Sequence, residues 1–240
     1  MHGLKAQLAE IRSIAASVKA TSPGADILIC PPSTLIERAV EAAQGLFAIG
    51  GQDCHSEISG AFTGDVSAQM LKDDGASAVI VGHSERRKAY GETDDRVAAK
   101  ASAARRAGLM AVVCVGESKA VRDSGEALAF CARQVVASLP RDLTGATCAV
   151  AYEPLWAVGE DEAARPEDIA GMHAHIRRTL MTHLGPDGAS VRILYGGSVT
   201  GANAARILAL PDVNGVLVGR ESLASAHFDA IVGAAAPSSE

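Results

Sequence analysis

Short apolar runs recur along the chain, and they predict buried parallel strands. Each run is rich in β-branched residues and nearly continuous in hydrophobicity. This pattern is typical of strands that helices cover on both faces, rather than of strands with one face in water. We therefore predict seven strands, over residues 27–32, 46–53, 77–84, 109–117, 148–154, 191–198 and 215–220.

Between these runs the apolar residues recur at helical spacing. The pattern begins at once, because residues 4–18 form an amphipathic repeat. Several helices carry start signals: a capping-box pair at Thr34 and Glu37, an acidic first turn after Thr93, and Pro166 in a first turn. We predict eight helices, over residues 4–18, 35–44, 67–75, 93–108, 125–139, 166–185, 201–210 and 222–233.

The alternation of strands and helices defines the fold class. It implies a parallel sheet with right-handed crossovers, which is either an open doubly wound sheet or a closed (β/α)₈ barrel. Eight helices with seven strands fit an α/β TIM barrel whose first β-strand is absent from this sequence. Because no Pro/Gly/Ser-rich linker interrupts the pattern, we expect residues 1–240 to form a single barrel domain.

Composition narrows the choice of partners and compartment. The net charge of −6 gives no electrostatic case for nucleic acid or an anionic membrane, although a small anionic substrate can still meet a locally positive site. No apolar run approaches the roughly 18 residues of a membrane span, and the start lacks a signal-peptide core. Five cysteines without a C-x-x-C pair suggest free thiols in a reducing cytosol. We expect a cytoplasmic protein.

The ends of the predicted strands carry the candidate chemistry, as parallel α/β folds require. His83 ends the strand over residues 77–84. A lone histidine there is more often a structural hydrogen-bonder. If a short helix starts at Ser84, however, its dipole would depress the pKa of His83 and keep the ring neutral. A neutral imidazole can donate a hydrogen bond to a carbonyl oxygen that is becoming an enolate.

Glu153 ends a second apolar strand, between Tyr152 and Pro154, with Trp156 close behind. A structural salt bridge is the plainer explanation of this carboxylate. Apolar and aromatic surroundings nevertheless raise the pKa of a carboxyl group and make it a competent general base. The small residues that follow, up to Pro166, predict a mobile lid rather than a plain connection.

Two glycine turns follow the last two strands, at Gly196-Gly197-Ser198 and at Gly219-Arg220. Backbone N–H groups at such turns cradle phosphate, and barrels often place a phosphate site after strands 7 and 8. One glycine pair alone usually means a tight turn. Two in succession favour a phosphate site.

Other motifs carry less information. The polar loop over residues 50–67 is long enough to be functional or to lie at an interface. His173 and His175 are two residues apart on a helix, so they point apart and are poor metal ligands. The sequence has no nucleophile-elbow, Walker or dinucleotide-binding motif.

Four of these segments together, "VGHSERR", "AYEPLWAVG", "YGGSV" and "GGQDCHSEISGAFTGDVSAQML", resemble the triosephosphate isomerase family. The similarity covers essentially the whole chain. It implies a (β/α)₈ barrel that interconverts D-glyceraldehyde 3-phosphate and dihydroxyacetone phosphate, in glycolysis and gluconeogenesis. Glu153 matches the catalytic base and His83 the electrophile. Glu85 matches a supporting carboxylate, and Cys114 a cysteine on the neighbouring strand.

The resemblance also implies the remaining parts of the site, with no metal or organic cofactor. The phosphate would be held by Gly159, Ser198, Gly219 and Arg220. The lid would include Pro154, Trp156, Ala157, Val158 and Ala164. The loop that would reach into a partner subunit of a homodimer contains Thr63, Gly64 and Asp65.

Three departures from the family pattern bear on activity. The family's first strand, with its Asn-x-Lys segment, has no counterpart before "MHG". The lid carries three acidic residues, Glu160, Asp161 and Glu162, which would repel a phosphate. Arg220 stands where the family commonly has a second glycine. Two alternatives therefore stay open: an isomerase of another small sugar phosphate, such as a tetrulose phosphate, or an impaired or non-catalytic phosphate-binding relative.

Overall fold

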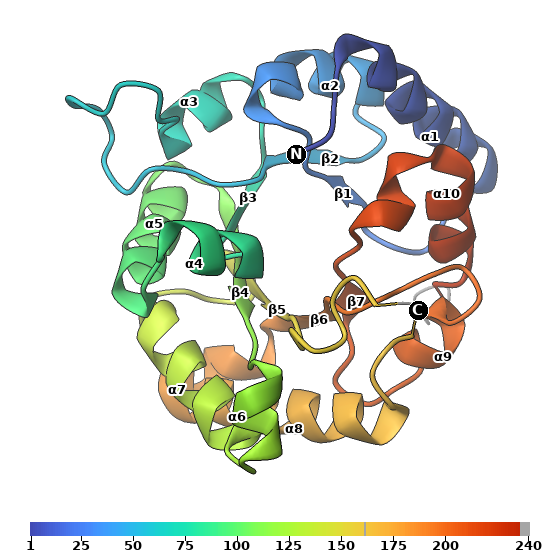
Figure 1. Ribbon diagram of the computed structural model, residues 1–240. Helices are drawn as coiled ribbons and strands as arrows, with labels where there is room; N and C mark the ends of the chain where they lie inside the picture. Colours follow the sequence, from blue (N-terminus) through green and yellow to red (C-terminus); the bar gives the residue numbers. More distant parts are fainter. Residues whose placement is uncertain (161, 236–240) are drawn as a thin grey trace.

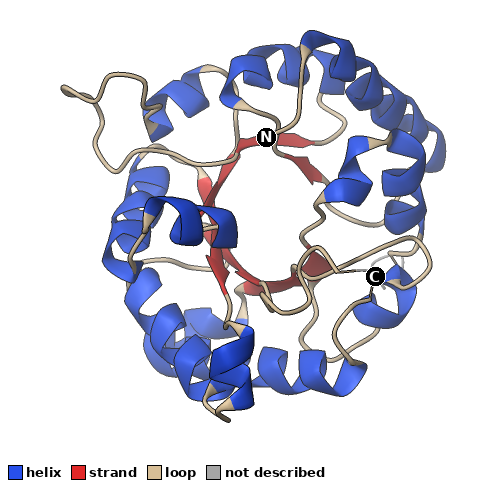
Figure 2. Cartoon of the chain, in the orientation of Figure 1, coloured by secondary structure: helices blue, strands red, loops and turns tan. Residues whose placement is uncertain are grey.

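The chain folds into a curved parallel sheet enclosed by helices. The computed structural model describes residues 1–160 and 162–235. Every strand pairs in parallel with the next one along the chain. Figure 2 shows the strands curling into an incomplete ring with the helices outside it. The strands are β1 (Leu28–Ile29), β2 (Ala48–Gly51), β3 (Ala78–Val81), β4 (Met110–Val115), β5 (Cys148–Tyr152), β6 (Arg192–Tyr195) and β7 (Gly215–Val216).

In the described part of the chain, β1 and β7 are the two edges of this seven-stranded sheet. A closed (β/α)₈ barrel has eight strands. The predicted fold, a TIM barrel with seven of its strands, is therefore confirmed. Each predicted strand contains one observed strand, and the observed strands are shorter because the ladder ends where the chain turns towards a helix.

The helices form the outer layer (Figure 1). Each of the eight predicted helices overlaps one of them, with α1 running three residues past its predicted end, and α4 and α6 are two more. The α-helices are α1 (Leu8–Thr21), α2 (Ile36–Ala43), α3 (Ala68–Asp73), α4 (Ser84–Tyr90), α5 (Asp94–Arg106), α6 (Lys119–Asp123), α7 (Ala127–Ser138), α8 (Pro166–Leu184), α9 (Ala204–Leu208) and α10 (Ser225–Gly233). The 3₁₀ turns are η1 (Lys5–Gln7), η2 (Ser33–Leu35), η3 (Gly185–Ala189) and η4 (Arg220–Leu223).

Two of the helix-start predictions are confirmed and one is wrong. The Thr93 side chain accepts a hydrogen bond from the Arg96 N–H and caps α5, and Pro166 lies in the first turn of α8. The capping box at Thr34 does not form, because the 3₁₀ turn η2 takes up this residue and α2 begins only at Ile36. A cap must precede the first helical turn, whereas Thr34 lies inside a different turn.

Side chains of each strand alternate between two apolar layers, and β4 shows this clearly. Ala111, Val113 and Val115 belong to the large core between sheet and helices. Val112 and Cys114 belong to a smaller cluster inside the ring of strands. This alternation follows from the two-residue period of a strand. No helix in the described part of the chain is long and apolar enough to cross a membrane.

Candidate active site

His83 and Glu153 meet at the carboxyl ends of β3 and β5, with a distance of 2.9 Å between His83 Nε2 and Glu153 Oε1. The two residues are far apart in sequence. They converge because β3, β4 and β5 are consecutive parallel neighbours, so that their carboxyl ends share one edge of the sheet. The geometry thus brings together the two residues for which the sequence predicted acid–base chemistry.

The His83 ring is oriented by the helix that follows it. His83 is the N-cap of α4, and its Nδ1 accepts a hydrogen bond from the Glu85 N–H at 3.3 Å. In a neutral ring the proton is then on Nε2, which points to Glu153. The expectation of a neutral His83 ring depended on a short helix beginning at Ser84. That helix is present as α4. Glu85 acts here through its backbone N–H, while its side chain is exposed.

The pKa of His83 is raised, contrary to the expectation from the helix dipole. Burial lowers this pKa, but the hydrogen bond to Glu153 and the negative charges of Glu153 and Glu85 outweigh it. The dipole prediction is wrong for this arrangement because a carboxylate in direct contact interacts more strongly with an imidazolium than the partial charge at a helix end does. The main influence that raises the pKa of His83 is therefore lost when the Glu153 side chain turns away from the ring.

Glu153 is almost completely buried, with 3% of its side chain exposed. Its carboxylate is satisfied by Ser84, whose N–H donates to Oε2 at 3.0 Å and whose Oγ–H donates to Oε1 at 3.2 Å. Ser84 is a site residue that the sequence analysis missed. Its position as the first residue of a helix at a strand end was the available signal, because free N–H groups at such an end attract carboxylates.

Cys114 of β4 and Gly116, which directly follows this strand, complete the surroundings of Glu153. A Cβ atom at Gly116 would collide with the Glu153 carbonyl oxygen, so glycine is required for this close approach. Burial, followed by the charge of Glu153, raises the pKa of the Cys114 thiol well above its ordinary value. Cys114, predicted near the site, is therefore a neutral thiol inside the ring of strands.

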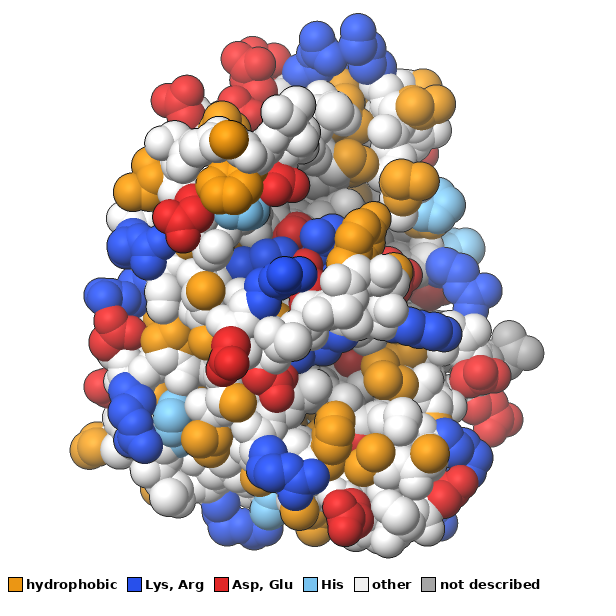
Figure 3. Space-filling model, turned by 60° about the vertical axis from the view of Figure 1, so that its left-hand side comes forward, with side chains coloured by type: hydrophobic (Ala, Val, Ile, Leu, Met, Phe, Trp, Pro, Cys, Tyr) orange, Lys and Arg blue, Asp and Glu red, His pale blue; other side chains and the backbone are white. Residues whose placement is uncertain are grey.

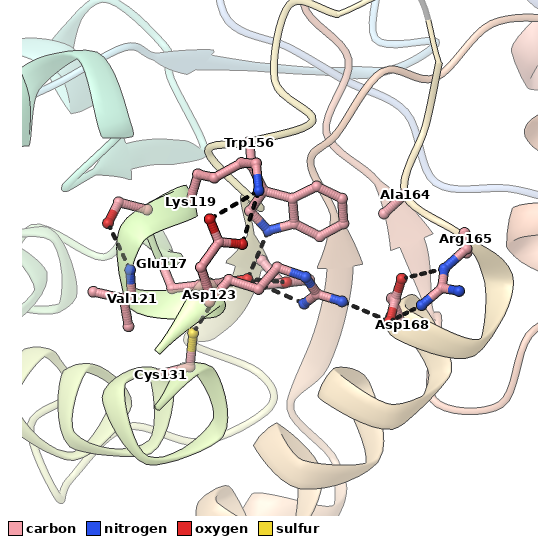
Figure 4. A network of polar contacts seen from close by, with 12 residues as sticks. Glu117, Lys119, Val121, Asp123, Cys131, Trp156, Ala164, Arg165 and Asp168 are labelled. Carbon is pink, nitrogen blue, oxygen red and sulfur yellow. Dashed lines mark hydrogen bonds and ion pairs between the residues drawn. The ribbon is translucent and has the colours of Figure 1, made fainter. Parts of the chain in front are cut away.

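The predicted lid is the segment that connects β5 to α8. Its first end is attached to Glu117 (Figure 4). Glu117 is fully buried, and its Oε1 accepts hydrogen bonds from Trp156 Nε1 at 2.7 Å and from the Tyr152 hydroxyl at 3.1 Å. The guanidinium of Arg122 lies 4.2 Å from the centre of the Trp156 ring. Trp156, expected in the lid, is thus fixed by a buried carboxylate and a cation.

The second end of the lid has its own anchors. The Ala164 N–H donates to the Tyr195 hydroxyl at 3.0 Å. Arg165 precedes α8 and pairs with Asp168, which also pairs with Arg122. Arg122 thus contacts Trp156 near one end of the lid and Asp168 beyond the other, so a single guanidinium contacts both ends.

The predicted phosphate residues gather where the lid meets the turns after β6 and β7. Ser198 Oγ lies 2.6 Å from the Glu160 carbonyl oxygen, and Arg220 Nη2 donates to the Gly159 carbonyl oxygen at 2.9 Å. Gly219 directly precedes the short turn η4. Gly159 has a φ of +77°, which favours glycine. Asp161, one of the acidic lid residues, lies outside the described residues.

The loop between β2 and α3 projects beyond the ring of helices (Figure 1). It contains the predicted partner-binding residues Thr63, Gly64 and Asp65, all of them exposed. Ile58 and Phe62 of the same loop are 56% and 42% exposed. Figure 3 brings this side of the molecule forward and shows hydrophobic side chains among the charged ones.

Comparison with known proteins assigns a family. A family model described as "Triosephosphate isomerase" matches residues 1–235. The triosephosphate isomerase of Rhodopseudomonas palustris (strain BisA53) is 52% identical over 235 residues, which cover 96% of this chain and 92% of that protein. That of Afipia carboxidovorans is 53% identical over 232 residues, with the same coverage.

A solved structure agrees with these sequence matches. The crystal structure of triosephosphate isomerase from Bartonella henselae superposes with a TM-score of 0.90 at 42% identity, covering 98% of this chain and 94% of that one. Fold, site geometry and sequence similarity lead to one conclusion. The chain belongs to the triosephosphate isomerase family, whose members interconvert D-glyceraldehyde 3-phosphate and dihydroxyacetone phosphate.

Proposed function

We propose that this chain interconverts D-glyceraldehyde 3-phosphate and dihydroxyacetone phosphate, with Glu153 as the base and His83 as the electrophile. The observation that carries the proposal is the 2.9 Å contact between His83 Nε2 and Glu153 Oε1 at the carboxyl ends of the strands. A glutamate base with a neutral histidine is the established pairing for this enzyme family, so the roles are assigned by analogy.

The chemistry follows from the two side chains. Glu153 takes a proton from the carbon beside the substrate carbonyl, while the His83 Nε2–H donates to the carbonyl oxygen and stabilises the enediolate. Glu153 then returns the proton to the neighbouring carbon. Glu153 must leave Ser84 to do this, and its departure removes the main influence that raises the pKa of His83.

The phosphate would lie against Gly159, Ser198, Gly219 and Arg220. The contact of Arg220 with the Gly159 carbonyl supports this placement, because it holds lid and turn together and sets a positive charge beside them. Anchored at both ends, the segment over residues 154–164 would close over the substrate. Closure excludes water from the enediolate and hinders loss of its phosphate.

A homodimer is part of the proposal. The loop with Thr63, Gly64 and Asp65 would insert beside the site of a second copy. Its exposed Ile58 and Phe62 support this role, because apolar side chains on a projecting loop become favourable when a partner covers them.

The test is a coupled assay on purified protein with Glu153→Gln and, as a matched control, Glu167→Gln. Glutamine keeps the shape of Glu153 but accepts no proton, so we expect kcat to fall at least about 1,000-fold. Glu167 is exposed on α8, and its variant should keep the full rate. Wild-type-like turnover by Glu153→Gln would overturn the mechanism. A higher kcat/KM for a tetrulose phosphate than for the triose phosphate would overturn the substrate assignment.

A further inference from the structure

A pocket lies outside the barrel, between α7 and the C-terminal half of α8, with a cavity volume of about 360 Å³. The lid joins α8 at its N-terminal end, so this pocket lies towards the opposite end of that helix from the candidate active site. The proposed catalytic mechanism uses none of its residues. Its polar lining consists of Arg141, His175, Arg178, Thr179, Thr182 and His183.

The lining is positively charged although the protein as a whole carries −6. Arg141 and Arg178 contribute two guanidinium groups, and no lining residue is acidic. Among the described residues, neither guanidinium forms an ion pair with a carboxylate. The acidic neighbour Asp142 is paired with Arg105 of α5. Two cations that share a cavity and lack a counter-ion attract an anion.

The histidines give the pocket a fixed floor. His183 is 8% exposed, and its Nε2 lies 2.7 Å from the Leu139 carbonyl oxygen. Arg141 donates to the His183 carbonyl oxygen at 3.0 Å, which places its guanidinium at the pocket. His175 Nε2 is buried, and no described residue bonds to it. A buried ring nitrogen without a partner is uncommon unless a ligand or water completes it.

The threonines contribute less to the binding of an anion. Thr179 and Thr182 already donate their hydroxyl protons to the carbonyl oxygens of His175 and Arg178 on their own helix. Recognition of an anion would therefore depend on the two guanidinium groups. Guanidinium forks match the oxygens of a phosphate group in a bidentate manner.

We propose that the α7–α8 pocket binds a phosphate dianion, either free or as the phosphate group of a small metabolite, at a site separate from the catalytic centre. The cavity volume is within the range of small-molecule sites. Inorganic phosphate and pyrophosphate are suitable probes, because tighter binding of pyrophosphate would show that the pocket accepts more than one phosphate group.

The test is an NMR titration of the full chain with ¹³C-labelled histidine rings. With inorganic phosphate, the His175 and His183 signals should shift together and saturate with one dissociation constant, whereas His83 reports separately on the catalytic site. In Arg178→Gln this dissociation constant should rise at least about tenfold, with the His83 response and the turnover unchanged. Arg178 is suited to the test because it lines the pocket and its side chain forms no hydrogen bond or ion pair with another described residue.

Arg133→Gln on α7 removes the same charge from a position beside Phe130 and Glu126, outside the pocket lining, and should leave phosphate binding as it is. The proposal is overturned if the His175 and His183 signals do not saturate. It is also overturned if Arg178→Gln and Arg133→Gln weaken binding equally, or if Arg178→Gln binds as tightly as the wild type.

Discussion

The guanidinium of Arg122 stacks 4.2 Å from the Trp156 ring centre and at the same time pairs with Asp168 at 2.5 Å. One side chain thereby contacts the segments on both sides of the proposed lid. Because α6 holds Arg122 outside the lid itself, the two ends of the lid share one support.

We predict that Arg122→Lys impairs lid movement. Lysine keeps the charge but cannot stack flat on an indole while it pairs with Asp168. A loss of about 0.5–1 kcal/mol of cation–π energy corresponds to a change in kcat of about twofold to fivefold. Trp156 is the only tryptophan in the sequence, so its fluorescence reports on this contact directly.

The emission of Trp156 should shift in Arg122→Lys. Arg133→Lys, which alters a stacked arginine on α7, should leave both emission and kcat unchanged. An unaltered emission spectrum in Arg122→Lys would contradict the assigned contact.

The raised pKa of His83 predicts how the free energy of unfolding depends on pH. Burial lowers this pKa, but the hydrogen bond and charge of Glu153 raise it above the ordinary value of 6.5. A raised pKa in the folded state stabilises the fold below pH 6.5, and this stabilisation is lost as the pH rises through the folded-state pKa. The free energy of unfolding lost in Glu153→Gln should therefore be larger at pH 6 than at pH 9.

Urea titrations at the two pH values measure this difference, and NMR titration of the His83 ring should show a lower midpoint in the variant. If Glu153→Gln lowers the stability equally at both pH values, the coupling between the two side chains is refuted.

A buried ion network beside the site makes a prediction about stability. Lys100 Nζ lies 2.6 Å from Glu92 Oε1 and 2.7 Å from Asp53 Oδ1, and its side chain is 7% exposed. Arg86 also pairs with both carboxylates, so Lys100→Met would remove one of two cations beside the buried Glu92 and the half-buried Asp53. We expect a loss of about 3 kcal/mol in the free energy of unfolding, because Glu92 stays buried with a weaker counter-charge.

Lys119→Met, which breaks an exposed pair with Asp123, should cost no more than about 1 kcal/mol. Equal losses of unfolding free energy in the two variants would show that burial does not strengthen the ion pairs of Lys100.

Arg220 tests the placement of the phosphate. Arg220→Ala removes the hydrogen bond to the Gly159 carbonyl and a positive charge beside it. We expect KM for the triose phosphate to rise about tenfold, with a smaller change in kcat, because the phosphate group does not react. Arg206→Ala on α9 is the control. A change in kcat alone for Arg220→Ala would place Arg220 elsewhere in the mechanism.

Much of this fold could be predicted from local signals. Near-continuous apolar runs identified all seven strands, and periodicity with caps such as Thr93 and Pro166 identified the longer helices. Helix α6 was missed because none of its five residues is buried, so no apolar period marks it. The capping pair at Thr34 matched a pattern that the preceding 3₁₀ turn overrides.

The sequence by itself determined the order of strands and helices and the strand ends that carry His83 and Glu153, because hydrophobic period and chain order are local properties. Only the tertiary structure decided what these residues meet. Ser84 as the partner of Glu153, the raised pKa of His83, and Arg122 between the two ends of the lid all depend on contacts between segments distant in the chain. Such contacts depend on how strands and helices pack, and short sequence patterns do not encode that packing.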